Sequence, residues 1–169
     1  MERGADEAMV EVRVALTFAE LEEARECWRA ANVARGKVPG RERAERVREK
    51  LADPEALVLV AVEGGRVVGM VLAEVGRAAD GAGPVVPELC HVSMVFVRPQ
   101  RWGTGVGAAL LGALKERAAG LGYVRLQLWT GAANERALAL YRRVGFRASG
   151  RRREISGVGQ VVHLVCSGG

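Results

Sequence analysis

The spacing of apolar residues changes along the chain and separates expected strands from expected helices. Residues 10–16, VEVRVAL, alternate with period two and predict a strand. Residues 17–33 instead predict a helix, because apolar side chains recur at helical spacing as Leu21, Ala24, Trp28 and Ala31. Thr17 and Glu20 have the spacing of a capping box, so we expect this helix to begin near Phe18.

The next part of the chain predicts one helix and three strands. Residues 41–53, RERAERVREKLAD, read as a helix that is strongly charged, has little to bury and lies on the surface. Residues 56–76 hold two apolar runs joined at EGGR, which is typical of a β-hairpin. After a glycine- and proline-containing loop at 77–87, residues 88–99 form an extended run that Pro99 closes.

The second half of the chain continues to alternate between helices and strands. Its expected elements are a helix from 106 to about 118, a strand at 123–130, a helix at 134–144, and extended segments at 146–155 and 160–166. The second helix is expected to end at Gly145, since glycine is favoured just after a helix. This order predicts a mixed α/β fold, and we expect a single domain over residues 1–169.

Composition narrows the class of protein. About half of the 169 residues are apolar, which suits one globular domain. No apolar run approaches the roughly 20 residues of a membrane span, and the first residues lack the apolar core of a signal peptide, so we expect a cytoplasmic protein without membrane contact. The three cysteines form no C-x-x-C pair and indicate buried, reduced thiols rather than disulfides or zinc ligands: Cys27, Cys90 and Cys166.

The charge favours an anionic ligand. The formal net charge is +5, and basic residues are scattered among acidic ones. Nucleic acid is disfavoured as a partner, because aromatic residues are few and no recognisable nucleic-acid-binding motif is present. A small molecule that carries phosphate would account for the positive net charge equally well.

A glycine-rich segment, RPQRWGTGVGAALL, lies where an expected strand turns into a helix. Gly103, Gly105 and Gly107 come at the start of that helix, where backbone N–H groups without intrahelical acceptors converge. Glycine permits a tight turn and leaves room for a phosphate group to approach these donors. The alternative is a turn that only permits close packing; three alternating glycines favour phosphate binding.

Two common phosphate-binding motifs fit this segment poorly. A Walker loop would end in Gly-Lys-Ser or Gly-Lys-Thr, which GVGAAL lacks. The sequence GTGVGA satisfies a variant of the dinucleotide fingerprint, but the next strand ends in LWTG without an acidic residue to bind a ribose. A dinucleotide oxidoreductase therefore remains only a secondary alternative.

The segment VFVRPQRWGTGVGAALLGALKERA, followed by LQLWTGAANERALALYRRVGF, resembles the GNAT superfamily of acyl-CoA-dependent N-acyltransferases. The expected order of elements along the whole chain agrees with this family. The resemblance implies a strongly twisted, mostly antiparallel sheet of about seven strands, splayed at its centre and flanked by about four helices. It also implies acetyl-CoA as cosubstrate, with no metal.

The resemblance assigns roles to particular residues. The loop that binds the CoA pyrophosphate would consist of Trp102, Gly103, Thr104, Gly105, Val106 and Gly107. The strand before it would pair with the pantetheine arm through Val95, Phe96 and Val97. Asn134 resembles the asparagine that contacts the pantetheine, and Tyr141 the tyrosine that faces the thioester sulfur.

The sequence departs from the family pattern at Trp102, where the loop usually begins with Arg or Gln. One charged or polar contact to phosphate is therefore missing at this position. The candidates to replace the charge are the neighbouring Arg101 and, on the later helix, Arg136 and Arg142.

Acyl transfer to an amine needs a base, an oxyanion donor and an acid for the departing thiolate. Tyr141 fits the acid, although on composition alone it would be a core aromatic, and the backbone N–H of Val95 could polarise the carbonyl. Some relatives use a Glu as base where this chain has Trp129, so that assignment fails. The remaining candidates for the base lie on the preceding strand, directly or through water: Glu88, His91 and Ser93.

Two other residues near these candidates are given structural roles. Cys90 could suggest a thiol nucleophile, but it neighbours His91 on a strand, and adjacent strand residues face opposite sides of a sheet. His163 is expected to belong to sheet packing.

The acceptor is the least defined feature. In this family the first two helices and the loop before the glycine strand flank the acceptor cleft, here residues 27–50 and 77–88. The first segment is basic, which suits an acceptor with a carboxylate or phosphate, such as an amino acid or a peptide terminus. A catalytically silent acyl-CoA sensor is the alternative function. A homodimer formed by pairing of the C-terminal strand at 160–166 is possible.

Overall fold

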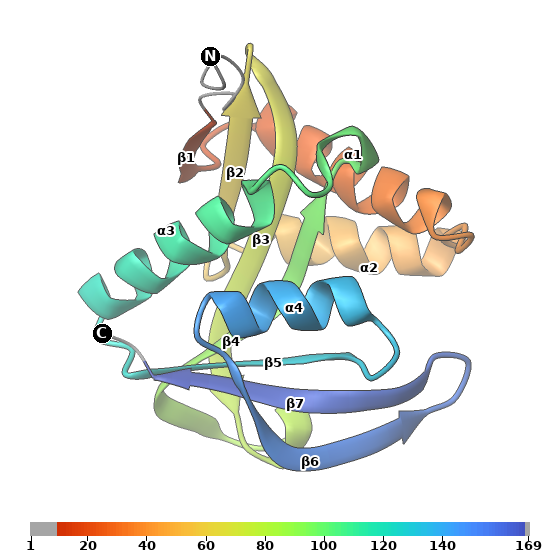
Figure 1. Ribbon diagram of the computed structural model, residues 1–169. Helices are drawn as coiled ribbons and strands as arrows, with labels where there is room; N and C mark the ends of the chain where they lie inside the picture. The colour runs from red at the N-terminus through yellow and green to blue at the C-terminus, as the bar shows by residue number, and fades with distance from the viewer. Residues whose placement is uncertain (1–9, 168–169) are drawn as a thin grey trace, which may run out of the picture. The chain divides into compact units, whose positions relative to one another are not determined.

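The computed structural model describes residues 10–167 and confirms the expected order of elements (Figure 1). The strands are β1 (Glu11–Val14), β2 (Leu57–Glu63), β3 (Arg66–Arg77), β4 (Val85–Val97), β5 (Arg125–Gly131), β6 (Arg147–Ile155) and β7 (Gly159–Ser167). The helices are α1 (Phe18–Ala34), α2 (Arg41–Ala52), α3 (Val106–Gly120) and α4 (Glu135–Arg143). Two short 3₁₀ turns are η1 (Ala79–Gly81) and η2 (Pro99–Arg101).

The strands form one seven-stranded, mostly antiparallel sheet in the order β1-β2-β3-β4-β5-β7-β6. The exception to the antiparallel pattern is β4 with β5, which pair in parallel from Leu89↔Arg125 to His91↔Gln127. This agrees with the expected mixed α/β fold. By contact clustering the chain divides into two compact units. The first contains residues up to 72 and residues 94–110, and the second contains residues 73–93 and those from 111 onward.

In the first unit, α1 and α2 cover a core to which β2 and β3 contribute. The buried cluster consists of Ala24, Cys27, Trp28, Val47, Leu51, Val58, Val60, Val67, Met70, Leu72 and Met94. The capping box at the start of α1 is confirmed, since Thr17 Oγ1 accepts a hydrogen bond from the N–H of Glu20 at 3.1 Å. Helix α2 buries only Val47 and Leu51, as its charged sequence predicts.

The EGGR hairpin between β2 and β3 is confirmed. Gly64 and Gly65 form the two-residue turn, with φ of 56° and 78°. Two positive φ values in succession are those of a type I′ turn, which matches the twist of the strands that it joins.

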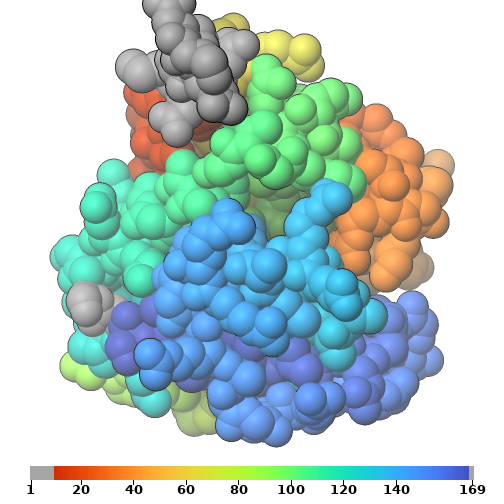
Figure 2. All heavy atoms as spheres, viewed as in Figure 1, coloured from red at the N-terminus to blue at the C-terminus, as the bar shows by residue number. Residues whose placement is uncertain are grey.

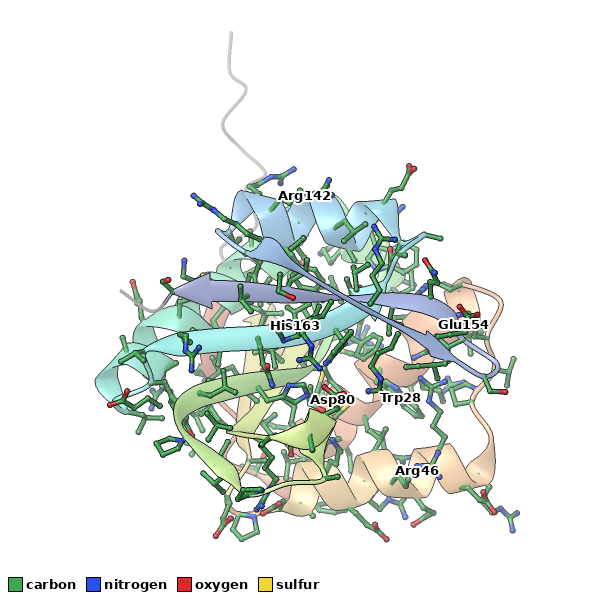
Figure 3. The ribbon with its side chains drawn as sticks, turned by 90° about the horizontal axis from the view of Figure 1, so that it is seen from below. Trp28, Arg46, Asp80, Arg142, Glu154 and His163 are labelled. Atoms are coloured by element: carbon green, nitrogen blue, oxygen red, sulfur yellow. The ribbon has the colours of Figure 1, made fainter. Side chains whose placement is uncertain are left out.

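In the second unit, β4, β5, β7 and β6 are neighbours in that order. Arg142 on α4 lies on one side of the strand that carries His163, and Asp80 lies on the other (Figure 3). Helix α4 ends as expected at Gly145, which has φ of 104°, and the N–H of Phe146 bonds back to the carbonyl of Tyr141 at 2.9 Å.

The expectation that the C-terminal strand offers a free edge for a homodimer is wrong. Strand β7 pairs with β5 along one side and with β6 along the other, so its backbone groups are already used. Strand β6 is instead the last strand of the sheet, and it carries Arg151, Arg152 and Arg153 in succession. Charged edge strands disfavour pairing with another chain.

A smaller difference concerns the start of one strand. Strand β4 begins at Val85, three residues before the expected start at Glu88, and it includes Pro87 near its beginning. Within the described residues, no helix is long and apolar enough to cross a membrane.

Candidate functional site

The glycine segment forms a sharp turn between β4 and α3 in the first unit. Gly103 and Gly105 have φ of 75° and 91°, a left-handed conformation that side chains with a Cβ disfavour. The residues at 103–105 are exposed, and Figure 2 shows this part of the chain, in green, at the surface. The sequence thus has glycine where the backbone of the turn requires it.

Hydrogen bonds from both sides hold the start of this turn. The Arg98 N–H and its Nε donate to the carbonyls of Val68 and Val67, each at 2.8 Å. The Thr104 hydroxyl donates to the carbonyl of Arg101 at 2.6 Å. The two Arg98 bonds therefore attach the start of the turn to β3, and the Thr104 bond closes the turn on itself.

The start of α3 provides backbone donors beside this turn. The first intrahelical bond runs from the Ala109 N–H to the Gly105 carbonyl at 3.0 Å. Helix geometry leaves the N–H groups of Val106, Gly107 and Ala108 without intrahelical acceptors, at the positive end of the helix dipole. A Cβ built on Gly103 or Gly105 meets no atom within 4 Å, so open space lies beside both glycines. A pyrophosphate fits these features, as CoA would require.

A further glycine sets the distance between α3 and β3. A Cβ on Gly69 would lie 3.0 Å from Leu110 Cδ1 and 3.0 Å from Val106 Cγ1, both buried side chains of α3. The helix therefore approaches β3 more closely than a larger residue would permit. This contact fixes the N-terminus of α3 and, with it, the donors described above.

The structure gives Trp102 and Arg101 contacts within the protein. The Trp102 indole N–H donates to the carbonyl of Val97 at 2.8 Å, which ties the loop to the end of β4. Arg101 forms a two-pronged ion pair with Glu63 at the end of β2, so its charge already has a partner. Arg136 and Arg142 belong to α4 in the second unit.

The strand residues expected to pair with pantetheine are only partly available for that role. Val97 uses its carbonyl to accept from Trp102, and Phe96 packs against the core of the first unit. Val95 is half-buried. Their contact with pantetheine, like the cofactor-binding role of Trp102 to Gly107, stays a prediction.

In the second unit, Asn134 caps α4. Its side-chain Oδ1 accepts from the N–H of Ala137 at 3.3 Å, so the amide oxygen serves the helix. A contact between Asn134 and pantetheine, which stays a prediction, would use its NH₂ group. Tyr141, in the last turn of α4, is buried and meets Phe146 edge to face, with ring centroids 5.9 Å apart.

The candidate bases on β4 lie in different surroundings. Glu88 is exposed and has φ of 66°, an unusual left-handed conformation for a residue with a side chain, and its carbonyl accepts from the Val124 N–H at 2.9 Å. His91 is half-buried, and its Nδ1 lies 3.3 Å from Nε2 of Gln127. Their catalytic roles stay predictions.

Cys90 is poorly placed to act as a nucleophile. Its side chain is buried, on the opposite side of the strand from His91 as alternation predicts, and burial raises the pKa of its thiol to about 11. The thiolate, which is the reactive form, is therefore scarce near neutral pH. All three cysteines are buried and free, as expected.

Gln127 is not among the residues predicted from the sequence, and His163 was expected only to pack within the sheet. Gln127 Oε1 lies 2.8 Å from His163 Nε2, and the other ring nitrogen of His163 lies 2.7 Å from Ser149 Oγ. His163 is buried, and burial lowers the pKa of its imidazole, with a further contribution from Arg151. A signal was present in the strand LQLW, where a polar residue alternates with apolar ones that are buried.

The loop expected to flank the acceptor is attached to β6 by an ion pair. Asp80, in η1, accepts from Arg151 at 2.6 Å, and this lowers the pKa of the Asp80 carboxyl. Arg151 and Arg153 lie over the ring of Trp129, at 5.2 and 5.6 Å from its centroid. The surface beside Trp129 is thus charged, with guanidinium groups in excess.

Among residues 10–167, no group of three or more His, Cys, Asp or Glu side chains is placed to hold a metal ion.

The comparisons with known proteins agree with this geometry. The sequence profile of the acetyltransferase (GNAT) family matches residues 19–146. A mycothiol acetyltransferase from Pseudarthrobacter chlorophenolicus is 34% identical over 128 residues; the match covers 72% of this chain and 38% of that protein. The chain thus aligns with well under half the length of that relative.

Solved structures of similar fold cover nearly the whole chain. The ribosomal-protein-S18-alanine N-acetyltransferase from Escherichia coli superposes with a TM-score of 0.74 at 20% identity, covering 95% of this chain and 94% of that one. An N-acetyltransferase from Thermoplasma acidophilum, in complex with coenzyme A, gives a TM-score of 0.62 at 17% identity, covering 91% and 97%. At these identities the likeness concerns the fold. The profile match over most of its length shows that this chain belongs to the acetyltransferase (GNAT) family.

Proposed function

We propose that this protein is an acetyl-CoA-dependent N-acetyltransferase that moves an acetyl group directly to the amine of an acceptor. The observation that carries the proposal is the turn at 103–105, whose open left-handed glycines adjoin the N-terminus of α3 in a chain of this family. Backbone donors there suit the pyrophosphate of CoA. A relative of the same fold, from Thermoplasma acidophilum, is described in complex with coenzyme A, which supports the choice of ligand.

Within this proposal, the glycine loop binds CoA without a charged side chain of its own at position 102. Trp102 donates to Val97 and Arg101 pairs with Glu63, so both side chains stabilise the turn. The binding energy for phosphate would then come mainly from backbone N–H groups, which act well when they are fixed in advance. The hydrogen bonds that attach Arg98 to β3 favour that condition.

The chemistry needs proton transfer at two points. We assign the protonation of the departing thiolate to Tyr141, because a phenol and a thiol have comparable pKa values. The base that deprotonates the acceptor ammonium is assigned to Glu88 or His91, directly or through a water molecule. Burial of Cys90, which also raises the pKa of its thiol, argues against a ping-pong route through this residue.

The acceptor is proposed only as a class: a small amine, an amino acid or a peptide N-terminus. Basic residues outnumber acidic ones in residues 27–50, which favours an acceptor with an anionic group. One similar protein is named a mycothiol acetyltransferase and another a ribosomal-protein-S18-alanine N-acetyltransferase, so family membership alone does not choose between a small molecule and a protein as acceptor.

Thiol release tests the proposal. Purified protein is incubated with acetyl-CoA and a panel of amino acids, their amides, peptides and polyamines, and free CoA is measured together with the mass of each acceptor. We expect CoA release with a gain of one acetyl group on an anionic acceptor. A preference for polyamines would contradict the acceptor class, and tight CoA binding without turnover on any acceptor would favour the silent sensor.

A cytoplasmic location also belongs to this proposal, and cell fractionation checks it. A dimer through β7 is not proposed, since that strand is paired on both sides.

A further inference from the structure

A chain of polar side chains crosses four neighbouring strands of the second unit. It runs from His91 on β4 through Gln127 on β5 and His163 on β7 to Ser149 on β6. Register brings these residues together, because His91 pairs with Gln127 across β4 and β5, and His163 pairs with Trp129 two residues further along β5. Trp129 covers His163, with ring centroids 4.9 Å apart.

The two contacts of the His163 ring together set the direction of the hydrogen bonds. The backbone N–H of Arg151 donates to Ser149 Oγ at 3.2 Å, so this oxygen already acts as an acceptor. Its own hydroxyl proton has an acceptor in the Nδ1 lone pair of His163, 2.7 Å away. At the other end of the ring, Gln127 Oε1, which can only accept, lies 2.8 Å from His163 Nε2, so His163 carries its proton on Nε2.

The same direction continues to His91. His163 Nε2–H donates to Gln127 Oε1 at 2.8 Å, which leaves the NH₂ group of Gln127 on the side of His91. That group donates to His91 Nδ1 at 3.3 Å, so the lone pair of His91 is on Nδ1 and its proton is on Nε2.

This series of hydrogen bonds requires a neutral His163, since an imidazolium has no acceptor nitrogen. Burial lowers the pKa of His163, Arg151 and His91 lower it further, and only Asp80 raises it among the charged groups that act on it. Its protonation state near neutral pH thus agrees with the geometry.

We propose that Gln127, His163 and Ser149 are positioning residues that hold His91 as the Nε2–H tautomer. The tautomer stands on the hydrogen bonds alone, whereas its catalytic meaning rests on the proposed function. A neutral His91 in this form has no lone pair on Nε2 and cannot accept the acceptor's proton there. In this form Nε2–H is a hydrogen-bond donor, so deprotonation of the acceptor falls to Glu88 or to water.

Nitrogen NMR of the wild-type protein reads the tautomers directly. The chain has only two histidines, so a long-range ¹H–¹⁵N correlation spectrum of the ¹⁵N-labelled protein shows two imidazoles, assigned with His91→Gln and His163→Gln. Above the imidazole pKa values we expect both rings to be protonated on Nε2 and not on Nδ1. Protonation of His91 on Nδ1 would overturn the proposal.

Gln127→Glu replaces a side chain that both donates and accepts hydrogen bonds by one that only accepts them. A carboxylate has no N–H to donate, so it must accept from both imidazoles, and His91 should change to protonation on Nδ1. The matched control is Gln160→Glu, which adds the same charge on β7 at an exposed side chain that bonds to Arg152. If His91 keeps its tautomer in Gln127→Glu, with the fold intact by circular dichroism, Gln127 does not set it.

Activity supplies a second readout once the acceptor panel yields turnover. Glutamine can donate from an amide NH₂ but cannot act as a base, so His91→Gln should lower kcat by less than a hundredfold, and His91→Ala, which can do neither, should lower it further. A fall of a hundredfold or more in His91→Gln, the usual effect of losing a general base, would overturn the donor role. If no acceptor reacts, the proposed function fails while the NMR result still decides the tautomer.

Discussion

Gly105→Ala tests whether the glycine turn binds the pyrophosphate of CoA. Gly105 has φ of 91°, and a Cβ there would meet no atom within 4 Å. The substitution therefore causes backbone strain but no clash. A left-handed alanine costs about 1–2 kcal/mol, partly offset by roughly 0.4–1 kcal/mol from the less flexible unfolded chain. We expect a net loss of about 1 kcal/mol, or a Tm lower by about 2–4 °C.

The effect on ligand binding should be larger than this strain. The new methyl group would occupy the open space through which a phosphate oxygen reaches the donors of α3. Losing one charge-assisted hydrogen bond costs about 1.5–3 kcal/mol, which corresponds to a Kd for CoA weaker by roughly tenfold to 150-fold. Titration calorimetry with CoA measures this change, and thermal unfolding measures the change in stability.

Gly150→Ala is the matched control. Gly150, on β6, has φ of 93° and likewise no atom within 4 Å of a built Cβ. It should lose similar stability and keep full affinity for CoA. Equal affinities in wild type, Gly105→Ala and Gly150→Ala would refute the assignment of the pyrophosphate to this turn.

Three further predictions concern the second unit. Tyr141→Phe should lower turnover at least tenfold while CoA affinity stays nearly constant, and Tyr123→Phe, at the other tyrosine of the chain, should leave both unchanged. Gly76→Ala should lose about 1–3 kcal/mol in chemical denaturation, because its Cβ would lie 2.5 Å from Leu89 Cδ2; unchanged stability would show that Leu89 moves aside freely. Since burial lowers the pKa of His163, the unfolded chain binds more protons below about pH 6.5. Stability should therefore fall as pH decreases through that range, and the fall should be smaller in His163→Gln.

Local signals in the sequence predicted most elements of the fold. Thr17 and Glu20 marked the start of α1, and the Thr17 side chain caps it as expected. EGGR predicted a two-residue hairpin, because consecutive glycines are what its two positive φ values require. In each case the deciding contact lies within a few residues along the chain.

Features that depend on distant pairing could not be predicted in the same way. Gln127 and His163 are 36 residues apart and meet only because β7 lies next to β5. The sequence allowed the C-terminal strand to pair across a dimer, whereas β6, not β7, is the last strand of the sheet.

In the glycine loop, the turn could be predicted from the sequence, whereas the partners of two side chains could not. Alternating glycines predicted the turn, since the requirement for positive φ is local. The indole of Trp102 bonds to Val97, and Arg101 pairs with Glu63 on another strand. From the sequence, Trp102 could only be described as a missing phosphate contact, because its actual partner depends on how the turn folds back on β4.

Titration calorimetry of the purified wild-type protein with acetyl-CoA, CoA and NAD tests the central claim most directly. The account predicts saturable binding of acetyl-CoA and CoA at one site per chain, with no binding of NAD. Absence of CoA binding would show that the turn at 103–105 does not bind pyrophosphate, and binding of NAD instead would favour a dinucleotide enzyme.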